Sequence, residues 1–302
     1  MNQKKLKVLF IAKNIPVKGI HSSRVVIDIA KHLASFCEIK FLYPNEKVPF
    51  GFQFIKKYKP FYNLKPWSFE SFEIAISLYN RIPVKKIAFN FWKKLSKKDI
   101  AYFESQDPFD LIHAHYIFPD GYLAYLFSER FKVPYVVTIR NADVRLIREL
   151  SQNDPDFRKA KLVIKKAKYV LTLNAAYKAF IEERFNVECR IIPHGIEKSA
   201  FKTPQIRKDR KVIITTIAEA IKRKNLDWVI NGVKRYKGKK KVLLNMIGKG
   251  PLIVKLKKLA EIDDRIVFTG RLEKQEVFNQ LAAGDIFALP SYDETFGMVY
   301  LE

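Results

Sequence analysis

Two acidic residues near the end of the chain have the spacing and setting of a binding site. The segment SYDETFGMVYLE, residues 291–302, places Glu294 and Glu302 with seven residues between them. The apolar run DIFALP precedes this segment, and Gly297 lies inside it. This order predicts a buried strand, a turn and the start of a helix. The first turn of a helix has unpaired backbone N–H groups and a positive dipole end, so it can hold a phosphate group.

The order of residues in this segment suggests a role for each. We expect Thr295, Phe296 and Gly297 at the start of the helix, where the glycine lets a ligand come close to the backbone. We expect Glu294 in the loop, with Glu302 two helical turns later on roughly the same side. One carboxylate could then bind a sugar hydroxyl and the other a ribose diol. The alternative is a pair of solvated surface acids, which the strand, turn and glycine context disfavours.

Short apolar runs alternate with amphipathic stretches along the chain. The apolar runs predict strands at 6–12, 38–43, 110–116, 134–140, 168–174 and 189–195, and again, after a polar stretch at 197–210, at 211–218, 241–248, 265–270 and 285–290. Apolar strands separated by helices indicate parallel sheets covered on both faces. Because a second series of strands follows the polar stretch, the sequence predicts two tandem Rossmann-like, doubly wound α/β domains, residues 1–198 and 199–302. Ligands of such sheets bind at the carboxyl ends of the strands.

Residues 44–105 interrupt this alternation and are expected to form an insertion in the N-terminal domain. The segment is dense in Phe, Tyr, Trp and Lys, and residues 84–103 predict a basic amphipathic helix. Interleaved basic and aromatic residues are typical of surfaces that bind anionic membranes. The alternative is a packed insertion whose lysines extend their alkyl chains over the surface into solvent.

The composition limits the classes of partner. The formal net charge is +25, from 56 Lys and Arg against 31 Asp and Glu, which indicates an anionic partner or surface. No helix-turn-helix, zinc or RNA-binding signature is present, so nucleic acid is not the expected partner. The two cysteines, Cys37 and Cys189, form no motif and suit a reducing cytoplasm. No apolar run reaches the ~20 residues that span a bilayer.

The end of the chain resembles the E-x7-E motif of family 4 retaining glycosyltransferases, which have the GT-B fold. Four other segments resemble family segments in the same order: DLIHAHYIFPDG (110–121), IIPHGIE (191–197), MIGKGPL (246–252) and RIVFTGRLEKQEV (265–277). The resemblance implies a UDP- or GDP-type nucleotide-sugar donor bound mainly by the C-terminal domain. It also implies an acceptor bound by the N-terminal domain, retention of the anomeric configuration, and no metal ion or other cofactor.

The resemblance also implies which residues meet the donor. Glu294 would contact the donor sugar, and Glu302 the ribose. Backbone groups of the turn would face the sugar and phosphates. The further donor-binding candidates are Gly19 in the first strand–helix loop, Gly248 in GKGP, and Thr295, Phe296, Gly297 and Met298. GKGP lacks a complete dinucleotide fingerprint, so no NAD site is expected.

One position departs from the family in charge. An Arg and a Lys usually neutralise the donor diphosphate, and Lys224 falls on the Lys position, but Glu219 falls on the Arg position. Lys222 or Arg223 could compensate from the same loop. A cation matters here because the leaving diphosphate gains negative charge in the transition state. The alternative is that residues 222–225 form a solvated loop.

In the N-terminal domain, candidate residues follow two predicted strands. His115 ends one strand, and the family has a His there that touches the donor sugar or the acceptor. We expect His113 to point the other way, although the sequence does not decide which of the two acts. Arg140 and Asp143 follow the next strand and could line the acceptor side. A buried helix-capping role for Asp143 is equally compatible with the sequence.

The sequence therefore predicts a cytoplasmic enzyme at the inner face of the plasma membrane. It would transfer a hexose with retention to a lipid-linked or polysaccharide acceptor of the cell envelope, with His115, Lys224 and Glu294 as catalytic residues. A non-catalytic nucleotide-sugar binder or an inactive truncated homologue is the alternative, which Glu219 favours. In the family the helix carrying Glu302 continues and further helices follow. We therefore expect the second domain to be incomplete in these 302 residues and the chain to be poorly active alone.

Overall fold

The computed structural model shows two compact units, Met1–Pro193 (unit 1) and His194–Glu302 (unit 2). It describes residues 5–17, 23–55, 58–82, 84–89, 94–203, 211–261, 263–292, 294 and 296–302. The division lies between Pro193 and His194, whereas the sequence predicts a domain boundary after residue 198. Among the described residues, no helix is both long and apolar enough to span a membrane.

Unit 1 is built on an eight-stranded sheet of order β3-β4-β2-β1-β5-β6-β7-β8. Its neighbouring strands are parallel, except that β3 runs antiparallel to β4. The strands are β1 (Leu6–Ile11), β2 (Cys37–Glu46), β3 (Trp67–Phe69), β4 (Phe72–Tyr79), β5 (Leu111–Ala114), β6 (Tyr135–Thr138), β7 (Tyr169–Thr172) and β8 (Cys189–Ile191).

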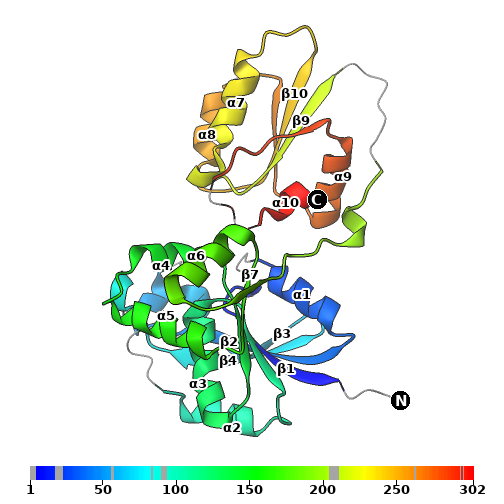
Figure 1. The fold of residues 1–302 in the computed structure, drawn as a ribbon. Coiled ribbons are helices and arrows are strands. Elements are labelled where there is room, and N and C mark those ends of the chain that lie inside the picture. Colours follow the sequence, from blue (N-terminus) through cyan, green and yellow to red (C-terminus); the bar gives the residue numbers. More distant parts are fainter. Residues whose placement is uncertain are drawn as a thin grey trace. The chain divides into compact units, whose positions relative to one another are not determined.

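Helices cover both faces of this sheet (Figure 1). Side chains alternate between the faces along a strand, so Leu9 and Ile11 join one buried cluster while Val8 and Phe10 join the other. The helix α1 (Val25–Leu33) packs in the second of these clusters. The first cluster holds the remaining helices: α2 (Lys97–Glu104), α3 (Tyr122–Phe131), α4 (Asn141–Glu149), α5 (Pro155–Lys166) and α6 (Ala175–Phe185).

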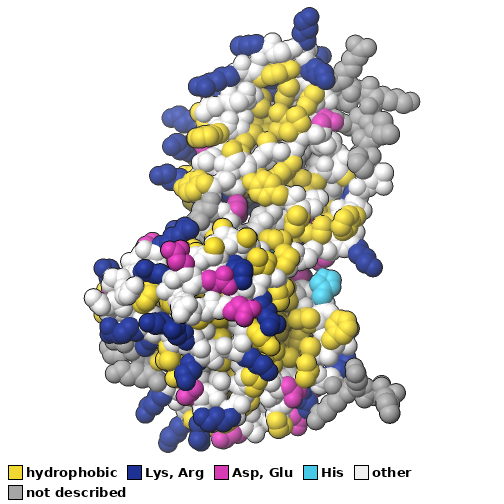
Figure 2. Space-filling model, viewed as in Figure 1, with side chains coloured by type: hydrophobic (Ala, Val, Ile, Leu, Met, Phe, Trp, Pro, Cys, Tyr) yellow, Lys and Arg dark blue, Asp and Glu magenta, His cyan; other side chains and the backbone are white. Residues whose placement is uncertain are grey.

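Unit 2 repeats the design on a smaller scale. Its four parallel strands have the order β11-β10-β9-β12, and Figure 1 shows α7 and α8 on one side of the sheet and α9 on the other. In Figure 2, Lys and Arg side chains gather over α7 and α8, while the middle of the visible face is hydrophobic. The elements are β9 (Val212–Ile217), α7 (Leu226–Arg235), β10 (Val242–Ile247), α8 (Ile253–Ala260), β11 (Ile266–Gly270), α9 (Lys274–Ala283), β12 (Ile286–Phe287) and α10 (Met298–Leu301). The predicted fold class, two doubly wound α/β units, is confirmed.

The segment 44–105 is not an insertion outside the sheet. It contains β3 and β4, and β4 pairs with β2 in parallel over residues 74–79. Both faces of β4 are buried, since Phe72 and Ile74 join the cluster that contains α1 while Tyr79 joins the other, so these residues extend the main sheet.

The single amphipathic helix predicted over residues 84–103 is wrong. The described residues form a short 3-10 turn, Lys85–Ile87, and the separate helix α2. Ser96 explains where α2 begins, because its hydroxyl accepts a hydrogen bond from the Asp99 N–H at 3.1 Å. The Asp99 carboxylate accepts one from the Ser96 N–H at 2.9 Å in return. This capping box favours a new helix at Lys97 over continuation of an earlier one.

Replacing Ser96 should therefore loosen α2. Ser96→Ala removes one half of the capping box and is expected to cost about 1 kcal/mol of local stability. Amide hydrogen exchange in α2 should then be about fivefold faster than in the unmodified chain. Ser105→Ala is the control, because the Ser105 hydroxyl lies at the other end of α2, where it donates to the Tyr102 carbonyl and accepts from the Gln106 side chain. Equal exchange rates in the two variants would contradict the assigned cap.

Candidate functional site

The loops after β9 and β12 meet at the carboxyl ends of these neighbouring strands. The loop after β9 ends in a 3-10 turn, η6, at Lys222–Lys224. The Tyr292 N–H donates to the Arg223 carbonyl at 3.0 Å, and the Asn225 side chain donates to the Pro290 carbonyl at 2.8 Å. The fold therefore brings residues 70 positions apart in the sequence into one cluster.

Glu294 pairs with two cations in this cluster. The Lys224 ammonium donates to the Glu294 carboxylate, and Arg223 Nη1 lies 3.2 Å from the same oxygen, Oε1. The Lys224 and Glu294 side chains are 12% and 22% exposed. Burial raises the pKa of Glu294, but Lys224, a hydrogen bond from Ser291 and the charge of Arg223 outweigh that effect, so the pKa lies below its usual value. The cluster holds two positive charges and one negative charge.

The two other charged side chains of the loop after β9 lie at the surface. Lys222 is exposed at the start of η6. Glu219, in the position where the family resemblance expects Arg, is exposed as well, and it forms no ion pair with any residue that the structure describes. The negative charge of Glu219 thus lies in the same loop as the three cations of η6.

Gly248 and Gly250 let the loop after β10 pack directly against the loop after β9. The Ala218 N–H donates to Ile247 at 3.1 Å, and the Ala220 N–H donates to Lys249 at 2.9 Å. Gly248 has φ +139°, and a Cβ there would lie 1.9 Å from the Ala218 carbonyl oxygen. The structure therefore gives Gly248 a packing role, while its contact with a donor stays a prediction.

The segment that carries Glu302 contains less helix than the sequence analysis expected. The helix α10 is four residues long, starts at Met298 and follows Gly297 at φ +67°. Glu294 and Glu302 are therefore not separated by two helical turns, and that expectation was wrong. The Phe296 ring lies against His194, with centroids 5.5 Å apart. Two further candidates, Gly19 and Thr295, lie outside the described residues.

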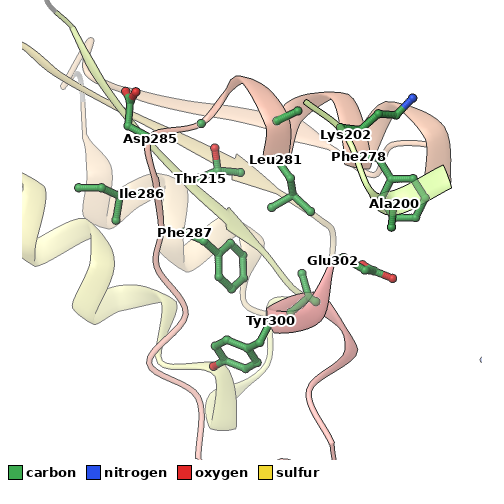
Figure 3. Close-up of a pocket in the computed structure, with 13 residues that line it drawn as sticks. Ala200, Lys202, Thr215, Phe278, Leu281, Asp285, Ile286, Phe287, Tyr300 and Glu302 are labelled. Atoms are coloured by element: carbon green, nitrogen blue, oxygen red, sulfur yellow. The ribbon is translucent and has the colours of Figure 1, made fainter. Parts of the chain in front are cut away.

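Glu302 has different surroundings from Glu294. It lines a cavity of about 320 Å³ between α9, α10 and the strands β9 and β12 (Figure 3). Apolar side chains such as Phe278, Leu281 and Phe287 form much of its wall. Burial raises the pKa of Glu302; Lys274 opposes this shift and Glu197 adds to it. The cavity lining does not include Glu294, so the structure does not bring the two carboxylates into one cluster.

In unit 1, His115 follows β5 and is fully buried. Its ring stacks on His113 at a centroid distance of 4.2 Å, and both rings contact Phe10. The expectation that His113 points the other way was wrong, because residues two apart on a strand share a face. His113 Nε2 lies 2.8 Å from Thr138 Oγ1, and burial lowers its pKa to about 3. Contact between a ligand and the His115 ring would require a rearrangement of neighbouring side chains.

Arg140 and Asp143 connect the ends of β5 and β6. Arg140 Nε donates to the His115 carbonyl at 3.0 Å, and the guanidinium lies over the Tyr116 ring. The Asp143 carboxylate accepts from the backbone N–H groups of Arg140 and Ile117, both at 2.9 Å. The capping alternative for Asp143 is thus what the structure shows, since this buried carboxylate fixes the start of α4 and the exit from β5.

A further polar cluster at this edge was missed. Lys13, which follows β1, donates to the Tyr79 hydroxyl at 2.5 Å and lies 4.0 Å from Glu46. Arg81 Nη1 lies 3.5 Å from the same Glu46 carboxylate. Burial lowers the pKa of Lys13 to about 8. The signal that could have revealed this cluster is the apolar alternation of Phe72–Tyr79, which marks β4 as a sheet strand.

Comparison with known proteins gives two family matches. The model described as Glycosyltransferase Family 4 matches residues 22–199, and the model described as Glycosyl transferases group 1 matches residues 210–302. The chain belongs to glycosyltransferase family 4. Among the residues that the structure describes, this family 4 chain has no group of three or more His, Cys, Asp or Glu side chains that could hold a metal ion.

Individual relatives are similar over most of the chain. TuaC of Bacillus subtilis (strain 168), named for teichuronic acid biosynthesis, is 25% identical over 82% of this chain, which spans 60% of the TuaC length. The structure of sucrose-phosphate synthase from Thermosynechococcus elongatus matches with TM-score 0.68 and 14% identity, covering 98% of this chain and 78% of that one. HepE of Anabaena, solved with UDP and glucose, matches with TM-score 0.61 and 15% identity over 97% of this chain and 77% of that one. These structural matches show the GT-B fold.

The surroundings of Gly248 and Gly232 predict opposite effects of an alanine substitution on the stability of unit 2. Gly248→Ala forces a side chain against the Ala218 carbonyl and should destabilise unit 2 by about 2 kcal/mol or more. Gly232→Ala is the matched control, because Gly232 lies within α7 and a Cβ there meets nothing within 4 Å. That variant should gain up to about 1 kcal/mol from helix propensity. Thermal denaturation should shift in opposite directions, and equal shifts would contradict the loop packing.

Proposed function

We propose that this protein is a retaining glycosyltransferase that uses a nucleotide-sugar donor and a lipid-linked or polysaccharide acceptor. The observation that carries the proposal is the cluster of Lys224, Arg223 and Glu294 at the carboxyl ends of β9 and β12. Its surplus positive charge lies at the edge of the sheet where doubly wound folds bind ligands. Membership of family 4 and the nucleotide-bound relative HepE support a nucleotide sugar as the donor.

The cluster suits a donor diphosphate because its cations are fixed before the donor binds. In the proposed reaction, the bond between the anomeric carbon and the diphosphate breaks, and the acceptor oxygen bonds to that carbon on the same face. The acceptor proton passes to the leaving diphosphate oxygen. Lys224 and Arg223 offset the charge that develops on this oxygen, and preorganised charges do so without reorganisation. Glu294 holds both cations in place and accepts a hydrogen bond from the donor sugar.

The remaining assignments follow the family resemblance. Glu302 binds the ribose, and the backbone around Phe296–Met298 faces the sugar and phosphates. His115 contacts the donor sugar once its neighbours rearrange, and Arg140 lies on the acceptor side. The reaction needs no metal ion, because protein cations neutralise the diphosphate. The relation to TuaC, named for teichuronic acid biosynthesis, supports a polysaccharide acceptor of the cell envelope. The location at the inner face of the plasma membrane stays a prediction from the sequence.

A second candidate is a protein that binds a nucleotide sugar without turning it over. Glu219 favours this candidate, because its exposed carboxylate stands in the loop where the family has a cation. Transfer or hydrolysis of a bound nucleotide sugar would exclude it. Binding without turnover would instead exclude the glycosyltransferase activity and would still support the proposed nucleotide-sugar site.

Donor binding can be tested on the 302-residue chain by thermal shift with UDP-, GDP- and ADP-sugars. One class should raise the melting temperature, since a ligand that prefers the folded state stabilises it, and EDTA should not change the shift. Lys224→Met should weaken donor affinity at least about tenfold by removing a charge-assisted contact. Lys255→Met is the control, because Lys255 is an exposed lysine on α8. Failure of all three donor classes, or equal affinities of the two variants, would overturn the donor site.

The role of Arg223 as the second cation can be tested separately. Arg223→Gln should weaken donor binding several-fold, because it leaves Glu294 with one cation. Lys222→Gln removes an exposed charge that makes no ion pair with Glu294 in the described structure, so its effect should be smaller. Adding Glu219→Arg to Arg223→Gln should restore binding, since it returns a cation to the same loop. A larger loss from Lys222→Gln than from Arg223→Gln would assign the compensating charge to Lys222.

A further inference from the structure

A loop at the carboxyl end of β2 exposes four apolar side chains. Residues 47–55, which we call the aromatic loop, include Phe50, Phe52, Phe54 and Ile55, exposed by 87%, 48%, 82% and 47%. Such a concentration within six positions is unusual, because large apolar side chains in a soluble fold are normally exposed singly. The loop therefore presents an apolar surface for which the core of unit 1 provides no cover.

Backbone hydrogen bonds give this loop a defined shape. The Lys47 N–H donates to the Tyr79 carbonyl at 2.8 Å, which ties the start of the loop to the end of β4. The Phe52 N–H donates to Pro49 at 3.2 Å, and the Ile55 N–H donates to Phe52 at 3.1 Å. The exposed rings are thus held on successive turns of an ordered segment.

The residues that follow tie the loop to the core. The buried Asn45 side chain donates to the Phe61 carbonyl at 2.9 Å. Phe61, Leu64 and Trp67 pack against the cluster that contains α1. The apolar tip is therefore mounted on a packed base, so its exposure does not come from a loose chain.

The charge around the loop points to one kind of partner. The sequence from 47 to 69 contains five lysines and no acidic residue. Lys47, Lys59 and Lys65 are exposed in the structure. Exposed phenylalanines flanked along the chain by exposed lysines match the interface of an anionic bilayer, where rings enter the acyl boundary and ammonium groups meet lipid phosphates.

The position of the loop relates it to the acceptor. Glu46, the last residue of β2, immediately precedes the loop and lies in the Lys13, Arg81 and Tyr79 cluster. A membrane that contacts the loop would therefore lie beside the carboxyl-terminal edge of the unit 1 sheet. That edge also carries Arg140, which the proposed function places on the acceptor side.

We infer that the aromatic loop, residues 47–55, is the membrane-docking element of this protein and presents the unit 1 sheet edge to an anionic lipid surface. The inference rests on the proposed function only for the statement that a lipid-linked acceptor is delivered there. Membrane docking itself follows from the exposed rings and the surrounding lysines, and it does not require a bound donor.

The test is co-sedimentation of the 302-residue chain with lipid vesicles. Vesicles of phosphatidylcholine with about one third phosphatidylglycerol should bind the chain better than phosphatidylcholine alone, and added salt should weaken that binding. The double variant Phe50→Ser, Phe54→Ser should lose at least about tenfold in partition, since each ring leaves the apolar phase. Phe50→Trp, Phe54→Trp should keep binding, because tryptophan also favours the interface.

Phe36→Ser is the matched control. Phe36 is 72% exposed but lies just before β2, at the other end of the same strand. It should bind vesicles like the unmodified chain. Failure of the unmodified chain to bind anionic vesicles, or equal binding by the double serine variant, would overturn the inference. The double variant should keep its melting temperature and its donor-induced thermal shift. A chain that docks on vesicles but binds no nucleotide sugar would refute the proposed function and leave the docking element standing.

Discussion

The ion pairs of Glu294 with Lys224 and Arg223 are the interaction on which the loops at the carboxyl ends of the unit 2 strands depend. They join the loop after β9 to the loop after β12, in parallel with two hydrogen bonds to backbone carbonyls. Partly buried charges are costly unless they are paired, so each member of the cluster restricts where the others can lie. The arrangement leaves one positive charge uncompensated at a strand end, and that surplus is what an anionic ligand would meet.

The carboxyl-terminal edge of the unit 1 sheet is organised by buried polar residues. Arg140 and Asp143 are buried there: Arg140 donates to the His115 carbonyl after β5, and Asp143 accepts from the backbone of Ile117 after β5 and of Arg140 after β6. These two side chains hold the loops that follow β5 and β6. The Lys13, Glu46 and Arg81 side chains at the same edge of the sheet are more exposed. Buried, hydrogen-bonded polar residues thus underlie a set of charged side chains that solvent reaches.

The aromatic loop joins this set of charged side chains to the surface of the protein. Because it begins at the last residue of β2, its position is fixed by the sheet, and the exposed rings share one edge with the polar cluster. The glycines of unit 2 also let loops at a sheet edge pack closely. Gly248 lets two loops touch through their backbones, so the cations of η6 are supported by the main chain of the neighbouring strand connection.

The sequence determined the fold class and most of its elements. Buried parallel strands have continuous apolar runs, and the helices that cover them have amphipathic patterns. It also identified the family and the motif that contains Glu294, since local order along the chain carries that information. It failed where long-range pairing decides the outcome. β4 became part of the main sheet through its pairing with β2, and Ser96 divided a predicted helix.

Only the tertiary structure decided which of these residues meet. The pairing of Glu294 with Lys224 and Arg223 depends on β12 lying beside β9. The sequence does not show that these strands are neighbours, because Lys224 and Glu294 are 70 positions apart. The burial of His115, the capping role of Asp143 and the Lys13 cluster likewise depend on strand order. The physical reason is the same in each case: residue types and spacing fix local conformation, whereas charge pairing and burial depend on neighbours that the fold supplies.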